Sequence, residues 1–286
     1  MSISTTTAQR TRPGGLGQQR QRSQRIAFAA KGQNVVLGLC GLATLAVVVQ
    51  FLAPLGIVRA QDLPPTTVIL GQLASLLADP LLWQAIYDTV YVWALGLLIA
   101  TAAGAILGLL IGSSERARNA LGSTIEFLRP IPSVALIPLV VLLFGPAYES
   151  ALILVIYASF WQVLIQTIYG VIDVDPVVAD TARSYRFTRI GIIRHVVLPT
   201  ALPFIMTGFR LASSVALVLT VTAQMMIGTP GIGQAITTAE SAGNTPKMYA
   251  LVLVTGFLGV LVNILARYIE KRLLSWHMSF RKEVEL

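Results

Sequence analysis

The stretch "DPVVADTARSYRFTRIGIIRHVVLPTALP", residues 175–203, separates two long apolar runs with four arginines, a histidine and three prolines. Asp175 followed by Pro176 is typical of a helix start, because aspartate caps the free N–H groups and proline suits the first turn. A second short helix is predicted to start at Thr188 and to stop at Pro199, since proline breaks the helical hydrogen-bond pattern. We therefore expect a two-helix elbow over residues 175–199.

The chain around this elbow has the composition of a membrane protein. Of its 286 residues, 55% are hydrophobic and 12% are charged, and the mean hydropathy is +0.73. A soluble domain averages about 25% charged residues. Because a helix needs about 20 apolar residues to cross a bilayer, the sequence predicts an all-α membrane protein with six transmembrane helices. They are expected at 34–56, 88–112, 131–145, 148–170, 203–227 and 247–268.

Two segments depart from a simple membrane helix. The third apolar run is short and has Pro130, Pro132 and Pro138 in or just before it, which predicts a broken helix whose freed backbone groups are satisfied by neighbouring protein. The segment 61–84 has too many prolines to cross a membrane. It is expected to form an amphipathic helix at the outer interface, with Trp83 at the depth of the lipid headgroups.

The distribution of cations predicts the topology. In the six-span arrangement only Arg59 and Lys247, of 21 lysines and arginines, fall outside the cytoplasmic side. Short cytoplasmic loops concentrate such residues, so both termini and the elbow are expected in the cytoplasm. The predicted organisation is a disordered basic tail (1–33), a first transmembrane helix (34–60), an extracytoplasmic interfacial segment (61–84), a core domain (85–275) and a C-terminal tail (276–286).

Several kinds of function are disfavoured. The net charge of +8 does not indicate nucleic-acid binding, because most cations flank apolar runs instead of forming a basic patch on a soluble face. Cys40 is the single cysteine, so the chain has neither an intrachain disulfide nor a Cys/His metal motif. The sequence also lacks a phosphate-binding P-loop. No catalytic residue, metal site or cofactor is therefore predicted in this chain.

The elbow resembles the cytoplasmic signature of the permease subunits of binding-protein-dependent ABC importers. That pattern runs Glu-Ala-Ala, three residues, Gly, nine residues, then Ile-x-Leu-Pro. Here Asp180, Thr181 and Ala182 stand at Glu-Ala-Ala, Arg186 stands at Gly, and the sequence 196–199, Val-Val-Leu-Pro, stands at the end with the spacing intact. Arg186 replaces the residue that most easily forms a tight turn, and it predicts an acidic contact on an ATPase partner.

Three further stretches are similar to the sulfonate, taurine and nitrate type of importer permease. They are "RPIPSVALIPLVVLLFG" at 129–145, "LPTALPFIMTGFRLA" at 198–212 and "GTPGIGQAI" at 228–236. The resemblance extends over about residues 60–275. It implies a type I ABC importer permease in the plasma (inner) membrane of a prokaryote, working as a homodimer with two ATPase subunits, which bind ATP, and an extracytoplasmic solute-binding protein.

The resemblance also implies a role for the elbow, which in this family inserts into a cleft of the ATPase subunit. The residues expected to transmit the movement of the ATPases are Asp180, Thr181, Ala182, Arg183, Ser184, Arg186, Val196, Leu198 and Pro199. The expected substrate is a small anion such as an alkanesulfonate, taurine or nitrate. Related permeases are associated with thiamine precursors and aromatic acids, which remain alternatives.

Polar residues on two predicted spans are candidates for lining the transport path. Ser213, Thr220 and Gln224 share one face of the fifth span, and Ser159, Gln162 and Gln166 share one face of the fourth. Equally, small polar residues hold membrane helices together, so lining and packing both remain open. No lysine or arginine is expected deep within a span, which places the choice of substrate outside this subunit.

Two other classes of protein fit the sequence less well. An ion-coupled secondary carrier usually has inverted repeats and broken helices in both halves, and the sequence has neither feature. An intramembrane enzyme needs a nucleophile with its base, paired carboxylates or metal ligands at membrane depth, whereas Asp88 and Glu149 lie at the ends of predicted spans. Copurification with an ATPase that has a P-loop distinguishes the ABC importer from both.

Overall fold

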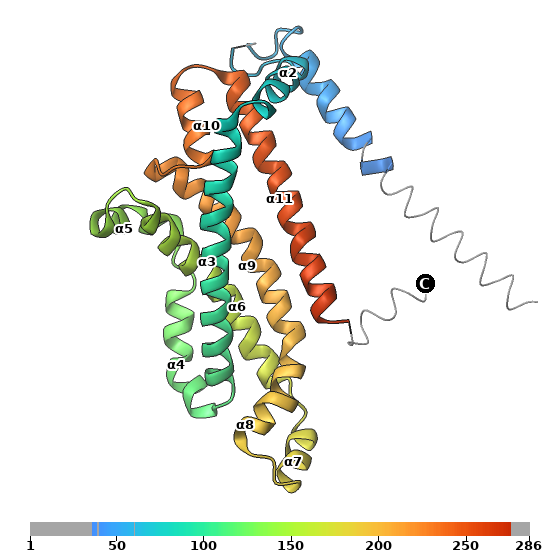
Figure 1. The fold of residues 1–286 in the computed structure, drawn as a ribbon, viewed down its shortest axis with the longest axis vertical. Coiled ribbons are helices and arrows are strands. Elements are labelled where there is room, and N and C mark those ends of the chain that lie inside the picture. Colours follow the sequence, from blue (N-terminus) through green and yellow to red (C-terminus); the bar gives the residue numbers. More distant parts are fainter. Residues whose placement is uncertain (1–35, 39, 60, 276–286) are drawn as a thin grey trace, which may run out of the picture.

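The computed structural model describes residues 36–38, 40–59 and 61–275, and all regular elements in this part of the chain are helices (Figure 1). The predicted tails 1–33 and 276–286 lie outside the described residues. The helices are α2 (Thr66–Leu77), α3 (Pro80–Gly112), α4 (Glu115–Leu128), the 3₁₀ turn η1 (Ser133–Leu136), α5 (Ile137–Phe144), α6 (Tyr148–Ile172), α7 (Pro176–Ser184), α8 (Arg189–Ile192), the π-helical turn η2 (Ile193–Val197), α9 (Leu198–Ile227), α10 (Ile232–Ser241) and α11 (Thr245–Leu273).

Four helical runs are long and apolar enough to cross a membrane: α3, α6, residues 189–227 and α11. A fifth crossing arises if α4 is counted together with η1 and α5, which meet at a bend of 78°. The expected first span is present as a shorter apolar helix, Val36–Leu52. The structure thus supports four or five spans of the six predicted, together with the all-helical class.

The third predicted span differs from its prediction. The sequence predicted a short broken helix at 131–145, but the helical pair begins at Glu115 and breaks at residues 129–132. Pro130 and Pro132 explain the break, because proline cannot donate to the helix and disfavours helical backbone before it. Pro138 lies in the first turn of α5, where proline is tolerated. Hydropathy missed α4 because this helix is amphipathic, with polar residues along much of its length.

The outer segment is also rearranged relative to the prediction. An interfacial helix is present as α2, but α3 already begins at Pro80, eight residues before the predicted span. Asp79 caps α3 by accepting a hydrogen bond from the N–H of Leu81, as expected for an aspartate before a proline. Trp83 therefore belongs to the first turn of a spanning helix, and its indole N–H donates to the carbonyl of Leu77.

Close packing of α3 against α6 holds the centre of the bundle together. The contact follows Gly96, Gly104, Gly108 and Gly112 at helical spacing, with Ala100 also buried. A Cβ atom added at Gly108 would lie 2.5 Å from Cβ of Thr167, and one added at Gly104 would lie 2.9 Å from Cβ of Val163. Small residues thus let the two backbones approach, and the pairing shows that α3 and α6 run in the same direction.

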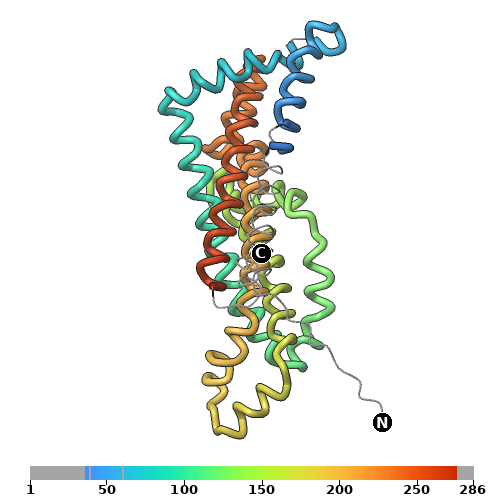
Figure 2. Tube along the Cα trace, turned by 90° about the vertical axis from the view of Figure 1, so that its right-hand side faces the viewer, coloured from blue at the N-terminus to red at the C-terminus, as the bar shows by residue number. Residues whose placement is uncertain are grey.

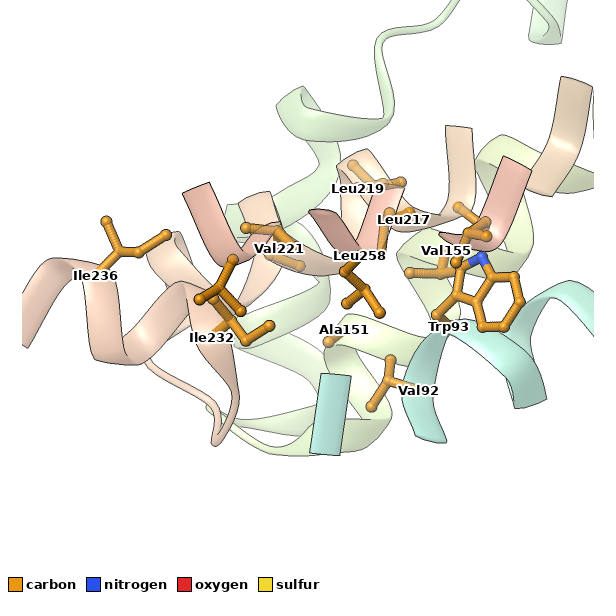
Figure 3. Close-up of a cluster of buried hydrophobic side chains, with 14 of the residues drawn as sticks. Val92, Trp93, Ala151, Val155, Leu217, Leu219, Val221, Ile232, Ile236 and Leu258 are labelled. Atoms are coloured by element: carbon orange, nitrogen blue, oxygen red, sulfur yellow. The ribbon is translucent and has the colours of Figure 1, made fainter. Parts of the chain in front are cut away.

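The main apolar core lies where α3, α6, α9, α10 and α11 meet (Figure 3). Trp93 of α3 packs there with Val155 of α6 and Leu217 of α9, and its indole N–H donates to the carbonyl of Ser213 at 3.0 Å. Ile232 and Ile236 bring α10 into the same cluster. This core holds α6 and α9 in place, the helices that carry the candidate path residues, and α9 is continuous with the elbow.

Residues 189–227 form one helical run of 39 residues, which corrects the prediction that a short helix would stop at Pro199. One π-helical turn precedes this proline, and the N–H of Leu198 donates to the carbonyl of Ile193, five residues back. The wider turn makes room for the ring of Pro199, which would otherwise clash with the preceding turn. The second helix of the elbow is therefore continuous with the spanning helix α9.

Candidate functional site

The elbow projects beyond one end of the bundle, at the opposite end from α2 (Figures 1 and 2). It consists of α7, a turn at 185–188, α8 and η2. The local sequence dictates this geometry, because Asp175 accepts from the N–H of Val177 and Thr188 accepts from the N–H of Gly191. Both helices begin where the sequence predicted.

The residues at the Glu-Ala-Ala positions build α7 itself. Asp180 accepts a hydrogen bond from Arg183 at 2.7 Å, and both side chains are mainly exposed. The hydroxyl of Thr181 donates to the carbonyl of Val177, and that of Ser184 donates to the carbonyl of Asp180. All of these contacts lie within α7, and they hold the polar side chains against their own helix.

Arg186 occupies the turn in the conformation that glycine would favour. Among the residues that the structure describes, it is the single non-glycine with a positive φ, +58°. The N–H of Arg186 donates to the carbonyl of Arg183, and that of Phe187 donates to the carbonyl of Ala182, which is the Schellman pattern of a helix end. The chain therefore makes this bend without glycine, and Arg186 adopts a left-handed conformation that is unfavourable for a residue with a Cβ atom.

The tip of the elbow exposes apolar side chains. Tyr185 is 76% exposed and Ile190 is 77% exposed, and Phe187 in the turn and Val177 at the start of α7 are exposed as well. Ala182 is the buried residue of α7. Val196 is half-buried in η2, whereas Leu198 and Pro199 are exposed at the start of α9. The expected coupling residues are thus brought together along one continuous elbow.

Four of the six candidate path residues lie in the packed interior of the chain. Ser159 and Ser213 are buried, and the hydroxyl of Ser159 lies 3.5 Å from the carbonyl of Ala212 on α9. Thr220 is buried and donates to the carbonyl of Ala216 in its own helix. Gln224, the fourth, is buried in a polar network.

That network fixes the start of α10. Oε1 of Gln224 lies 3.0 Å from the hydroxyl of Thr89 on α3 and accepts from the N–H of Gly233. The N–H of Ile232 donates to the hydroxyl of Thr89. The N-cap residue of α10 is Gly231, which has no side chain to satisfy these groups, so α3 and α9 supply the capping atoms.

The other two candidates, Gln162 and Gln166, are half-buried on α6. Gln166 packs against α9, where its Cβ would lie 3.1 Å from a Cβ added at Gly208. Gln162 lines a cavity of about 500 Å³ between the end of α3, α4 and α6. Of the six candidates, Gln162 is the one that borders this cavity.

Charged residues of α4 and its C-cap line the same cavity, and the sequence analysis did not assign them to a site. They are Arg118, Glu126 and Arg129. The sequence predicted Arg129 in a cytoplasmic loop. In the structure it is the C-cap of α4, at the opposite end of this 14-residue helix from its N-cap, Ser114. The amphipathic pattern of 115–128 could have revealed this helix, whereas its low hydropathy concealed it.

Comparison with known proteins agrees with this architecture. Residues 100–275 match the family model of the binding-protein-dependent transport system inner membrane component. The chain is 31% identical over 243 residues to a putative aliphatic sulfonates transport permease of Bacillus subtilis, covering 85% of this chain and 88% of that protein. It is 30% identical over 250 residues to a taurine transport permease of Escherichia coli, covering 86% and 91%.

Solved structures share the fold at low sequence identity. A bacterial ABC transporter for import of the acidic polysaccharide alginate superposes with a TM-score of 0.59 at 15% identity, covering 90% of this chain and 98% of that chain. An amino acid ABC transporter gives a TM-score of 0.58 at 20% identity, covering 70% and 97%. The family match sets aside an intramembrane enzyme and an ion-coupled carrier. The chain belongs to the family of binding-protein-dependent transport system inner membrane components and is a multi-pass, non-catalytic permease subunit of an ABC importer.

Proposed function

We propose that this permease forms a homodimer with two ATPase subunits and carries a small anion, delivered by an extracytoplasmic binding protein, into the cytoplasm. Membership of a binding-protein-dependent family implies both kinds of partner. ATP binding closes the ATPase pair, and the elbow transmits that movement to α9, exchanging inward-open and outward-open states. Both termini of the permease then lie in the cytoplasm.

The observation that carries the coupling role is the exposed apolar tip of the elbow. Tyr185, Ile190 and Val177 project from the end of the bundle together with four arginines. A cluster of exposed apolar side chains is typical of a protein contact surface. The continuity of α8, η2 and α9 gives a rigid connection from this surface to the core of the bundle.

Disulfide crosslinking tests the elbow. In a Cys40→Ala background, Tyr185→Cys is paired with cysteines placed across the contact cleft of the copurified ATPase. We expect crosslinks whose yield changes when ATP is added, because the cleft moves with the ATPases. Arg59→Cys serves as the control, since Arg59 is equally exposed but lies beside α2 at the other end of the bundle. Absence of crosslinks throughout a scan of residues 176–190 would rule out docking through the elbow.

The proposed substrate class rests on the relatives. The two permeases above are named for aliphatic sulfonates and taurine, and a nitrate import permease of Leptolyngbya laminosa is 30% identical over 179 residues, covering 63% of this chain and 64% of that protein. All three ligands carry a compact oxyanion. Mass spectrometry of the ligand retained by the purified binding protein identifies the substrate. If that ligand were a thiamine precursor or an aromatic acid, it would replace the small anion as the proposed substrate.

For the transport path, we propose that Gln162 and Gln166 contribute polar groups, while the buried polar residues of α9 support the helices around them. Replacing Gln162 by leucine is expected to slow uptake in proteoliposomes without loss of assembly. Gln234→Leu is the matched control, because Gln234 lies on α10 and bonds the carbonyl of Gly228, away from this cavity. Equal uptake by both variants would remove Gln162 from the path.

A further inference from the structure

We propose that a cavity between α3, the start of α6 and the turn before α10 binds an organic ammonium group, whose positive charge is held by tyrosine rings and one carboxylate. Tyr87, Asp88 and Tyr91 line this cavity from α3, Tyr148 lines it from the first turn of α6, and Pro230 lines it from the turn. Its volume of about 590 Å³ suits a small molecule. The site goes beyond the proposed function, because the solute proposed above is an anion.

The packing of the core brings these three elements together. Gly96 of α3 packs against Val155 of α6, and the two helices run in the same direction. Thr89 lies seven residues before Gly96, and Tyr148 lies seven residues before Val155, so the start of α6 lies beside the turn of α3 that contains Thr89. The hydroxyl of Thr89 also accepts from the N–H of Ile232, which brings the turn before α10 to the same place.

The tyrosine rings supply faces that attract a cation. The rings of Tyr87 and Tyr91 stack with their centroids 6.3 Å apart and an angle of 21° between their planes. Together with Tyr148 they are between 48% and 67% exposed, so the site is an open cleft that a ligand can reach. A positive charge within about 6 Å of such a ring centroid is attracted by the ring quadrupole. The chain makes such a contact elsewhere, because Cζ of Arg272 lies 5.3 Å from the ring centroid of Tyr268.

Asp88 supplies a negative charge beside these rings. This residue is half-buried, and within the described part of the chain its carboxylate has neither a hydrogen bond nor an ion pair. Its helix α3 is long and apolar enough to cross a membrane, and an ionisable group in such a helix faces a cavity or a partner, because contact with lipid is costly. None of the described residues that line this cavity is a lysine or an arginine. A ligand with a positive charge therefore satisfies the carboxylate of Asp88.

Two other roles for these residues make different predictions. Lys247 borders a neighbouring cavity that Asp88 also lines, but the two side chains form no ion pair among those of the described residues. Tyrosines also gather at the ends of membrane helices as an interfacial belt. A belt requires no carboxylate among its rings and holds no soluble cation, so a binding measurement separates the two roles from the ammonium site.

Choline and an uncharged analogue of the same shape test the site. The full-length permease is purified with the subunits that accompany it in dodecyl maltoside, an uncharged detergent, and bound tritiated choline is measured by scintillation proximity. 3,3-Dimethylbutanol, in which carbon replaces the nitrogen, is expected to compete at least about tenfold less well than choline, because it carries no positive charge. Ethanesulfonate is expected not to compete. Equal competition by choline and by the alcohol would leave only an apolar cleft and would overturn the site.

Charge variants assign the binding to named residues. Asp88→Asn is expected to weaken choline binding about tenfold, because it removes the opposite charge. Lys247→Gln is expected to strengthen binding about twofold, since it removes a like charge from the neighbouring cavity. Opposite shifts cannot come from misfolding. Glu240→Gln is the matched control, because Glu240 is exposed on α10 and does not line the cavity, so binding should be unchanged.

Tyrosine variants separate the ring from its hydroxyl. Tyr148→Phe keeps the ring face and is expected to bind choline within about twofold of the unchanged protein, whereas Tyr148→Leu is expected to weaken binding several-fold. Tyr268→Leu is the control, since the ring of Tyr268 lies on α11 beside Arg272 and outside the cavity. If the phenylalanine variant lost as much binding as the leucine variant, the ring would not be the contact and the proposal would be wrong.

A lipid headgroup is a second source of the same ammonium group. If phosphatidylethanolamine added to the micelles displaces choline and phosphatidylglycerol does not, the ammonium site is confirmed and its occupant is a lipid. If neither lipid displaces choline, the occupant is a soluble ligand. Equal displacement by both lipids, or choline binding that does not depend on Asp88, would overturn the site. The measurement needs neither nucleotide nor binding protein, so its failure is distinguishable from failure of the elbow to crosslink to an ATPase.

Discussion

The hydroxyl oxygen of Thr89 on α3 lies 3.0 Å from Oε1 of Gln224 on α9, and both side chains are fully buried. Between them they accept the N–H groups of Ile232 and Gly233 at the start of α10. The corner between α9 and α10 is thereby joined to α3, whose Thr89 lies 135 residues before Gln224 in the sequence. The first turn of α10, unlike that of α3, depends on side chains from other helices for its cap.

Removing the hydroxyl of Thr89 should loosen this junction. Thr89→Val keeps the shape of the side chain but leaves the N–H of Ile232 without its acceptor, which costs about 1–3 kcal/mol when the group is buried. The midpoint of thermal unfolding of the purified permease is expected to fall. Thr222→Val is the matched control, because the hydroxyl of Thr222 is exposed and bonds only the carbonyl of Val218 in its own helix. Similar midpoints for both variants would contradict the structural role of Thr89.

A methyl group at Gly108 should force α3 and α6 apart. Its Cβ would lie 2.5 Å from Cβ of Thr167, and overpacking of this kind costs about 1–3 kcal/mol. Gly256→Ala provides the opposite case, because its Cβ would meet nothing within 4 Å and alanine is a better helix former by up to about 1 kcal/mol. Unfolding midpoints of the two variants should shift in opposite directions. An unchanged midpoint for Gly108→Ala would show that the two helices separate freely.

Glycine at position 186 should relieve strain in the elbow. A non-glycine residue in the left-handed region costs about 1–2 kcal/mol, and Arg186 has a φ of +58°. Arg186→Gly is expected to keep ATPase assembly and transport, whereas Arg186→Val should weaken both, because a β-branched residue tolerates this φ poorly. Copurified ATPase per permease measures the effect. If Arg186→Gly lost the ATPase, the guanidinium itself would be the contact, as an acidic partner residue predicts.

The ion pair of Arg210 and Glu270 should couple α9 to α11. Their side chains approach to 3.4 Å, and that of Glu270 is only 12% exposed. The pair is intermediate between surface and buried cases, so a double-mutant cycle with Arg210→Gln and Glu270→Gln should give a coupling of about 1–2 kcal/mol. The unfolding free energy in detergent is the readout. Strict additivity of the two changes would show that each residue acts alone.

Local signals in the sequence predicted the elements of the elbow well. Two capping signals predicted the helix starts: Asp175 before Pro176, and Thr188 before an isoleucine-rich turn. Such signals are local, because capping involves atoms only two or three residues apart. The end of the second helix was wrong, since proline usually stops a helix. Here one π-helical turn, which the sequence does not reveal, absorbs Pro199.

Positions that depend on distant partners could not be predicted. Ser159, Ser213, Thr220 and Gln224 share helical faces, but only the packing of α3, α6 and α9 places them in the interior of the chain. Arg129 was expected in a cytoplasmic loop, and the 14 residues of α4 together with the bond from Tyr157 to Leu128 place it at the far end of α4, beside the middle of α6. A hydropathy pattern contains no information about such contacts.

The sequence by itself determined the membrane class, the helical character of nearly every segment, the elbow and the resemblance to importer permeases, because composition, capping and motif spacing are local properties. The tertiary structure alone decided which polar residues are buried and which line a cavity. Those features depend on the approach of helices that are far apart in the sequence, as between Thr89 and Gln224. Such contacts arise only when the bundle packs, and they determine where charge can lie within the membrane.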